Sequence, residues 1–452
     1  MQSRSKETGK DRHPTIVGPS RYPARTVEGR ARWVKSLMRR NLFFILIDCL
    51  RADLCYGERG SAKTPVFSRL RQQGTSFNQA IAVATFTTPS VGSIMTGLYP
   101  FAHGIRSLSG HKLAPRCVTL AEILRQEGYQ THALATGPLL PETGLNRGFE
   151  AYHHRRGKEH LYTGWRSQLD TELDRLARQR EGWFLFLHLW EIHAPRHLSP
   201  SFNRAEFGKT RYERALSSLD HELERILKRI DLAQTVVVLH GDHGERYERS
   251  IAERTIRKLK RHLLGWGAGR GWYKLGHGYH VYDFLVRVPL IFMGQGLFPA
   301  GTQIGAQVRQ IDIMPTILDA MGIPLDHSVK IHGRSLLPLI NGRQMEELPA
   351  LMEACGLGNP DPRERLIGIR VPPWKYVFAP ANPKIPAELY HLGEDPQETN
   401  NMVNQHPAIA EELRAAIAAT QSGFGEEETS APMTREEQEK VEERLRELGY
   451  ID

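Results

Sequence analysis

Two apolar runs in this sequence end in side chains that can bind a cation. Asp48 follows six consecutive apolar residues, and Asp242 and His243 follow a second apolar run and stand between glycines. A buried carboxylate requires a partner or a cation. Together with the hydroxyl of Thr87, these side chains would form a mixed oxygen and nitrogen set. Such a set suits Zn, Mn, Mg or Ca and does not select among them.

Thr87 begins the segment TTPSVGSIMTG, in which Pro89 suits a first helical turn and Gly97 suits a helix end. A hydroxyl at this place can simply cap the helix. It also lies at the positive end of the helix dipole, where an oxyanion is stabilised. We therefore consider Thr87 both as a cap and as a nucleophile. Ser90 in this segment, and Arg51 in the loop after the first acid, are candidates for substrate binding.

Three histidines are further candidates for contact with a substrate. They are His193 in WEIHAP, His277 in GHGYH and His103 in YPFAHG. An imidazole can protonate a leaving group or hold a substrate oxygen near neutral pH. Because the chain contains 20 histidines, a single one is more often structural or exposed. These three gain weight only if the fold brings them to the acids.

Unbroken apolar runs predict strands that are buried on both faces, as in a parallel sheet. They lie at 41–48, 131–135, 183–189, 235–239 and 288–292. Helical patterns lie between them, at 64–74, 118–128, 212–230 and 312–321. Strands that alternate with helices predict a layered α/β fold with a mainly parallel central sheet. The carboxyl ends of such strands are where functional side chains gather.

The pattern changes after residue 330, and the chain divides accordingly. Short strand-like pieces precede two helical stretches, 407–420 and 435–448, which predicts a smaller C-terminal α+β subdomain over 331–452. Residues 39–330 are predicted to form the catalytic domain. Residues 1–38 carry no sustained apolar period and are expected to be a basic, disordered tail.

The net charge of +9 is concentrated in the tail, where the first 40 residues hold 11 Lys or Arg against 3 acids. The rest of the chain is nearly neutral, so nucleic-acid binding has little support. The segment 246–274 looks like an insertion and holds nine Lys or Arg and two Glu. We interpret it as a solvated surface helix. The alternatives are a basic lid over an anionic substrate and a peripheral membrane contact.

Four cysteines without a CxxC pair argue against a disulfide framework. No apolar run is long enough to cross a bilayer, and no secretory signal is visible. These features lead us to expect a cytoplasmic protein without a transmembrane segment.

Taken in order, the segments resemble the sulfatase family of the alkaline phosphatase superfamily. The series is NLFFILIDCLRADLCYG, TPVFSRLRQQGTSFNQAIA, TTPSVGSIMTGLYPFAHGI, FLFLHLWEIHAPRH, VVVLHGDHGE, HVYDFLVRVPLIFMG, RQIDIMPTILDAMGIP, GRSLLPLI, ELYHLGEDPQETNN and ERLRELGYID, which runs nearly to the chain end. The resemblance implies an alkaline phosphatase-like three-layer sandwich. It also implies that one divalent cation is surrounded by Asp48, Thr87, Asp242 and His243, with His193, His277 and less surely His103 facing the substrate.

The chain departs from the family pattern at the nucleophile. The family's cysteine, which maturation converts to formylglycine, corresponds to Thr87, and its arginine corresponds to Val91. The family's second acid, after Asp48, is Cys49 here, which removes one oxygen ligand. A threonine ester lacks the second hydroxyl through which formylglycine expels sulfate, so it must be hydrolysed by direct attack. That chemistry is familiar from the threonine phosphodiesterases of the wider superfamily.

The resemblance and this departure together predict a metal-dependent hydrolase that cleaves phosphate or phosphonate esters, including diesters, through Thr87. Three alternatives stay open: hydrolysis of sulfuric esters, phosphoryl transfer to an alcohol acceptor, and a non-catalytic protein that binds an anion or a partner. The expected substrate or ligand is anionic in every case.

Overall fold

The computed structural model describes residues 39–155, 157, 159–179, 182–246, 277–356, 363, 365–422 and 431–450. The predicted tail, and the predicted insertion beyond Arg246, lie outside the described residues. The chain divides into two compact units, Met1–Arg39 and Arg40–Asp452. The second unit carries all the elements that follow.

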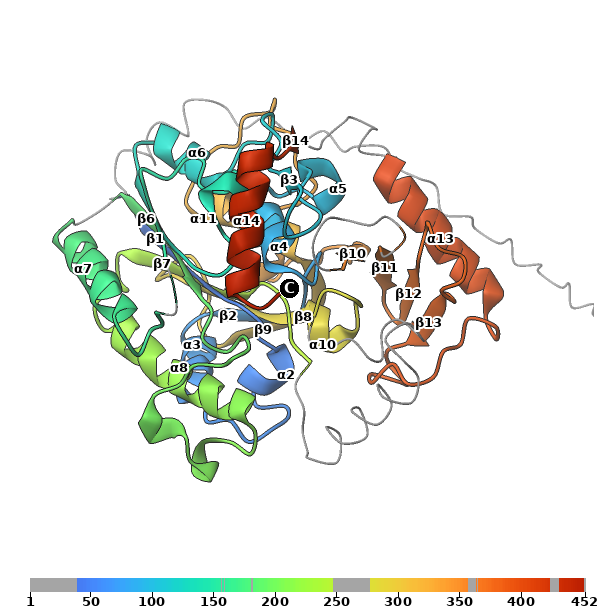
Figure 1. The fold of residues 1–452 in the computed structure, drawn as a ribbon, viewed down its shortest axis with the longest axis horizontal. Coiled ribbons are helices and arrows are strands. Elements are labelled where there is room, and N and C mark those ends of the chain that lie inside the picture. Colours follow the sequence, from blue (N-terminus) through green and yellow to red (C-terminus); the bar gives the residue numbers. More distant parts are fainter. Residues whose placement is uncertain are drawn as a thin grey trace, which may run out of the picture. The chain divides into compact units, whose positions relative to one another are not determined.

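An eight-stranded sheet forms the centre of this unit (Figure 1). Its strand order is β5-β4-β6-β1-β7-β8-β2-β9, and β8 is antiparallel to both of its neighbours while all other pairs are parallel. The strands are β1 (Asn41–Ile47), β2 (Thr75–Ile81), β4 (Gln130–Ala135), β5 (Ala151–His154), β6 (Trp183–Leu189), β7 (Thr235–Gly241), β8 (Arg287–Met293) and β9 (Thr302–Arg309). The predicted α/β class with a mainly parallel sheet is confirmed.

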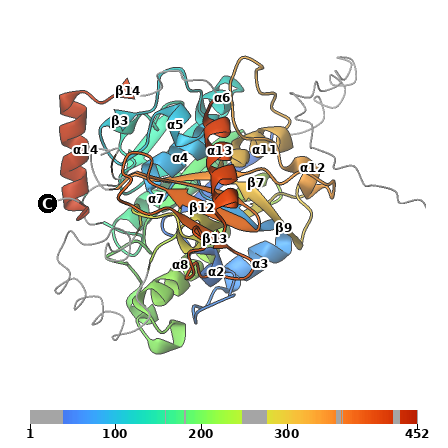
Figure 2. The same cartoon turned by 90° about the vertical axis from the view of Figure 1, so that its right-hand side faces the viewer.

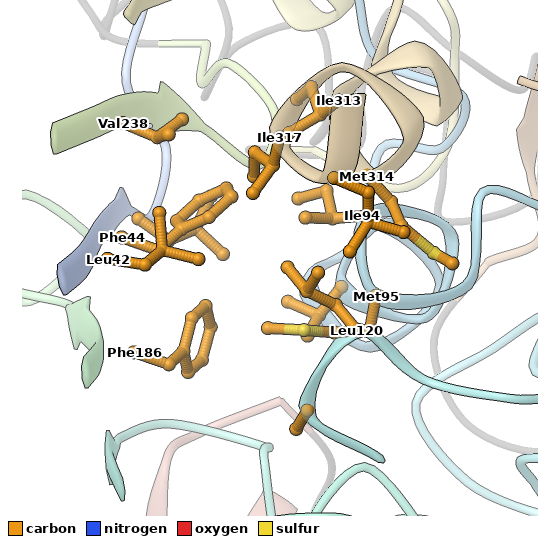
Figure 3. Close-up of a cluster of buried hydrophobic side chains, with 14 of the residues drawn as sticks. Leu42, Phe44, Ile94, Met95, Leu120, Phe186, Val238, Ile313, Met314 and Ile317 are labelled. Atoms are coloured by element: carbon orange, nitrogen blue, oxygen red, sulfur yellow. The ribbon is translucent and has the colours of Figure 1, made fainter. Parts of the chain in front are cut away.

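Helices cover both faces of the sheet, which explains why the central strands are apolar on both sides. Alternate residues of β1 enter two different cores, with Phe44 in one and Phe43 in the other. The first core lies under α4 (Thr87–Thr96), α6 (Leu120–Gln126) and α11 (Ile313–Ala320) (Figure 3). The second lies under α2 (Ala52–Cys55), α3 (Pro65–Gln73), α7 (Trp165–Arg178) and α8 (Arg211–Leu227). The result is a three-layer sandwich, as predicted.

A small antiparallel sheet follows in the C-terminal part (Figure 2). Its strands are β10 (Ala350–Ala354), β11 (Leu366–Val371), β12 (Trp374–Phe378) and β13 (Glu388–His391), and α13 (Pro407–Ser422) packs on it. The fully buried Lys375 joins this sheet to the larger part through Asp283, at 3.0 Å.

The last helix, α14 (Arg435–Glu447), leaves the small sheet and returns to the catalytic part. The strand β14 (Ala431–Pro432), which precedes the helix, pairs with β3 (His111–Lys112). The region 331–452 therefore contains a small sheet with α13 packed on it, and two helices, α12 (Leu337–Ile340) and α14, that pack elsewhere.

Candidate active site

The four predicted cation ligands meet where β1 and β7 end and α4 begins. The hydroxyl of Thr87 donates to Asp48 Oδ2 at 3.0 Å and lies 3.4 Å from His243 Nε2. The same nitrogen lies 3.4 Å from Asp242 Oδ2 and 4.0 Å from Asp48 Oδ1. Ligand atoms about 2.0–2.2 Å from one tetrahedral ion lie about 3.3–3.6 Å from each other. The four side chains therefore need only small shifts to hold an ion.

Two oxygen atoms in this cluster lack a partner in the described structure, Asp48 Oδ1 and Asp242 Oδ2. Both residues are fully buried. Burial, followed by the neighbouring Asp242, raises the pKa of Asp48 well above its ordinary value. Burial also raises the pKa of Asp242 to about 7. A divalent cation would neutralise this pair and supply the missing partner, so the cluster fits a metal site.

The ring of His243 is oriented so that one of its nitrogens can bind the cation. Its Nδ1 lies 2.9 Å from the carbonyl oxygen of Gly244, which can only accept a hydrogen bond. The proton therefore sits on Nδ1, and the Nε2 lone pair faces the two acids. Burial, with His277 adding to it, lowers the pKa of His243 well below its ordinary value and keeps the ring neutral.

Thr87 does not cap its helix. The N-cap of α4 is Phe86, which makes no side-chain capping bond, and Thr87 is the first helical residue. The capping role considered for Thr87 is therefore wrong, because its hydroxyl points to Asp48 instead of to the backbone. This position leaves the oxygen among the ligand atoms and at the positive end of a ten-residue helix.

His277 and His193 extend the site beyond the cation cluster. The ring of His277 lies 4.3 Å from that of His243 and 5.2 Å from that of His193, between centroids. Its Nδ1 lies 3.3 Å from Glu245 Oε2. Burial would raise the pKa of Glu245, but His277, His193 and Arg196 together outweigh burial and lower that pKa. Burial, with His277 adding to it, lowers the pKa of His193 to about 3.

His103 holds α4 from within the fold. Its Nε2 lies 3.0 Å from Ser93 Oγ, more than one turn beyond Thr87, and its Nδ1 accepts from the backbone N–H of Ile105 at 3.2 Å. The ring is fully buried. These contacts give His103 a structural task, and its contact with substrate stays a prediction.

Ser90 and Arg51 are likewise engaged with the protein around the site. The Ser90 hydroxyl donates to the Ala84 carbonyl at 3.1 Å. Arg51 donates to both oxygens of Asp53, at 2.9 and 2.7 Å, and to the Glu245 carbonyl at 3.3 Å. Their predicted roles in substrate binding remain predictions.

Four residues of the site were not predicted. Cys49 Sγ lies 3.6 Å from His277 Nδ1, and the carboxylate of Glu245 holds His277. His188 keeps a buried, unpartnered Nε2 and forms a candidate ligand group with the two acids. Tyr450, near the chain end, reaches both outer histidines. Glu245 belongs to the DHGE segment and His188 interrupts an apolar run, so the sequence carried a signal for these two.

Gly278 offers a test of how tightly the site is assembled. Its φ is +87°, and an added Cβ would lie 1.8 Å from Cζ of Phe86, the residue before Thr87. Gly342 has a similar φ of +78° but open space around it. We expect Gly342→Ala to lower the free energy of unfolding by about 1 kcal/mol from backbone strain alone. Gly278→Ala should lower it by about 3 kcal/mol, because overpacking adds to the strain, and should also reduce turnover. Equal losses of unfolding free energy for the two variants in urea denaturation would contradict the close approach of Gly278 to Phe86.

Comparison with known proteins now identifies the class. Residues 40–323 match the family model Sulfatase, and residues 270–422 match the model N-sulphoglucosamine sulphohydrolase, C-terminal. The chain belongs to the sulfatase family, within the alkaline phosphatase superfamily, and is a hydrolase of ester bonds. The candidate ligand groups around Asp48 agree with the divalent-cation dependence that is typical of this family.

Individual relatives are distant. The chain is 23% identical to an N-acetylgalactosamine-6-O-sulfatase from Bacteroides thetaiotaomicron, over 84% of this chain and 93% of that protein. It is 29% identical to human arylsulfatase K, over 42% of this chain and 32% of that protein. The solved phosphonate monoester hydrolase of Agrobacterium radiobacter shares the fold, with a TM-score of 0.67, 18% identity, and coverage of 85% of this chain and 96% of that one.

Among the helices of the described ranges, none is both long and apolar enough to cross a bilayer.

Proposed function

We propose that this protein is a metal-dependent hydrolase of phosphate or phosphonate esters, with Thr87 as the nucleophile. The observation that carries the proposal is the hydrogen bond of 3.0 Å from the Thr87 hydroxyl to Asp48, within a cluster of unpartnered carboxylate oxygens. The hydroxyl is thus held beside the cation site and has an acceptor for its proton.

The cation site contains a nitrogen ligand, His243, and has Cys49 in place of a second acid beside Asp48. Calcium prefers six to eight oxygen ligands, whereas imidazole suits zinc and related metals. This donor set favours Zn or Mn. When bound, the ion would lower the pKa of the Thr87 hydroxyl and draw charge from the ester oxygen.

The first step transfers the phosphoryl group to the protein. Thr87 Oγ1 passes its proton to Asp48 Oδ2 and forms a bond to phosphorus while the bond from phosphorus to the leaving oxygen breaks. His277, held by the Glu245 carboxylate at 3.3 Å, gives a proton to the leaving oxygen. The N-terminus of α4 adds positive potential where negative charge develops.

The second step restores the enzyme. A water molecule gives one proton to His277 as its oxygen bonds to phosphorus, the bond from phosphorus to Oγ1 breaks, and Oγ1 regains the proton held by Asp48. Hydrolysis of a sulfo-threonine by the same route is the second candidate function. It is favoured by the sulfatase relative that covers 84% of this chain.

The ester class can be decided with one panel. The purified protein would first be analysed for bound metal, then assayed on nitrophenyl sulfate, phosphate monoester, phosphate diester and phosphonate, with and without chelator. We expect chelator-sensitive turnover that is fastest on a phosphorus ester. Fastest turnover of the sulfate would favour the second candidate. Bound metal without turnover of any ester would favour an anion-binding protein and overturn both.

A further inference from the structure

The C-terminal helix α14 is fastened to the part of the chain that carries the site. Lys112 pairs with Glu437 at 2.7 and 2.9 Å. Arg444 donates to the backbone carbonyls of Gly137 and Arg155, at 3.4 and 3.3 Å. Figure 1 shows α14 in red, in front of α4, and Figure 2 shows it at the left-hand side of the same unit. These polar contacts fix the direction in which the chain leaves α14.

The apolar side of α14 packs in the same buried cluster as Phe86, the N-cap residue of α4. Val441 and Leu445 pack in one buried cluster with Phe86 and Leu108, and Tyr450 packs against that cluster. Since Phe86 is the N-cap of α4, the position of the chain end is tied to the position of Thr87.

The hydroxyl of Tyr450 lies between the two outer histidines. It is 2.6 Å from His193 Nε2 and 3.4 Å from His277 Nε2. Trp190 stacks on the His193 ring at 4.4 Å between centroids, which holds that ring in place. The phenol oxygen thus occupies the leaving-group side of the site as we have proposed it.

The acceptors around the rings fix the direction of these hydrogen bonds. His193 Nδ1 faces the Ala194 carbonyl at 2.6 Å, so its proton lies on Nδ1 and its Nε2 accepts from Tyr450. His277 Nδ1 faces the Glu245 carboxylate and therefore carries a proton as well. The Nε2 of His277 is then the ring nitrogen left to serve the leaving oxygen, and the Tyr450 oxygen 3.4 Å from it fixes how the ring is turned.

We propose that Tyr450 is a positioning residue of the active site, which joins His193 and His277 and aims the His277 proton at the leaving oxygen. This inference rests on the proposed function and deepens it. It makes the chain end a necessary part of the site, whereas the cation cluster is complete without it.

A substitution of one oxygen atom tests this role. Tyr450→Phe keeps the ring and removes the hydroxyl. Tyr152→Phe is the matched control, because the Tyr152 hydroxyl donates to the Leu139 carbonyl at 2.8 Å from the edge strand β5. Both variants would be assayed with a phenyl and a p-nitrophenyl ester of the class that the wild type turns over. A phenyl leaving group needs the proton more, because phenol is the weaker acid.

We expect Tyr450→Phe to lower kcat for the phenyl ester by about 10²-fold, a typical contribution of proton transfer. For the p-nitrophenyl ester, the fold-loss of kcat should be less than about one tenth of that. KM should change little for both esters. The unfolding temperature and metal content should match those of Tyr152→Phe. Unchanged kcat, or equal losses for the two leaving groups, would overturn the proposal.

A second measurement separates this inference from the proposed function. Histidine ring nitrogens can be followed by long-range proton–nitrogen NMR in the full chain. We expect Tyr450→Phe, and not Tyr152→Phe, to shift the ring signals of His193 and His277. Unshifted signals would overturn the proposal that the Tyr450 hydroxyl bridges His193 and His277, even in an active enzyme. A wild type without ester turnover would instead overturn the proposed function and leave the shifts to decide on the bridge.

Discussion

Thr87→Ala should lower turnover by about 10⁴- to 10⁶-fold, which is the usual effect of removing a covalent nucleophile. The variant loses the only atom of this side chain that lies among the cation ligands, the Oγ1 at 3.0 Å from Asp48. The acids and His243 remain, so bound metal and the unfolding temperature should stay close to those of the wild type. The measurements are kcat/KM, metal content by elemental analysis, and thermal unfolding.

The neighbouring Thr88 is a matched control. It is also buried, and its hydroxyl has no hydrogen-bond partner in the described structure. Thr88→Ala makes the same chemical change one residue away and should keep turnover within about threefold of the wild type. Thr87→Ser should retain part of the activity, because a hydroxyl remains. Turnover by Thr87→Ala within tenfold of that of Thr88→Ala would exclude Thr87 as the nucleophile.

The inner strands were predictable because burial on both faces leaves an unbroken apolar run. All seven residues of β1 are buried, and the same holds for β6 and β7. The strand at 288–292 was predicted for the same reason, but its antiparallel direction depends on the path of the chain and leaves no mark on composition. The strands β2, β5 and β9 were missed. β9 lies at the sheet edge with half of its residues exposed or half-exposed, so polar residues interrupt its pattern.

The cation cluster could be predicted in part, since Asp48, Asp242 and His243 follow strands that end at one edge of the sheet. The histidines could not be ranked from the sequence. His277 faces Glu245, whereas His103 bonds to Ser93, and only the fold distinguishes them. Tyr450 could not be found at all, because it meets His193 across 257 residues of sequence. A contact of that kind is created by the return of α14, which no local pattern encodes.

Asp48→Asn should change stability in opposite directions with and without a cation. Burial raises the pKa of Asp48 well above its ordinary value and that of Asp242 to about 7. Acids whose pKa is raised by folding make the metal-free protein lose stability as pH rises from about 4, through their folded-state values. At pH 8 with chelator, replacing one buried acid by a neutral amide removes part of that cost. The unfolding temperature of Asp48→Asn should then exceed that of the wild type by a few degrees.

With a cation at about 1,000 times its dissociation constant, the wild type gains about 4.1 kcal/mol, which corresponds to about 4 °C for a chain of this size. Asp48→Asn lacks one anionic ligand, so it should gain little and fall below the wild type. Asp220→Asn is the control, because Asp220 is a buried acid that accepts from Val66 and Phe67 N–H at 3.0 Å each, at the start of α3. The difference in unfolding temperature between Asp220→Asn and the wild type should be the same with and without chelator. If Asp48→Asn behaves like Asp220→Asn in thermal unfolding, Asp48 is not a metal ligand. The change in unfolding temperature should reverse its sign between the two conditions only for Asp48→Asn. That result requires the Asp48 carboxylate to be destabilised by burial in the metal-free protein and stabilised when the cation is bound.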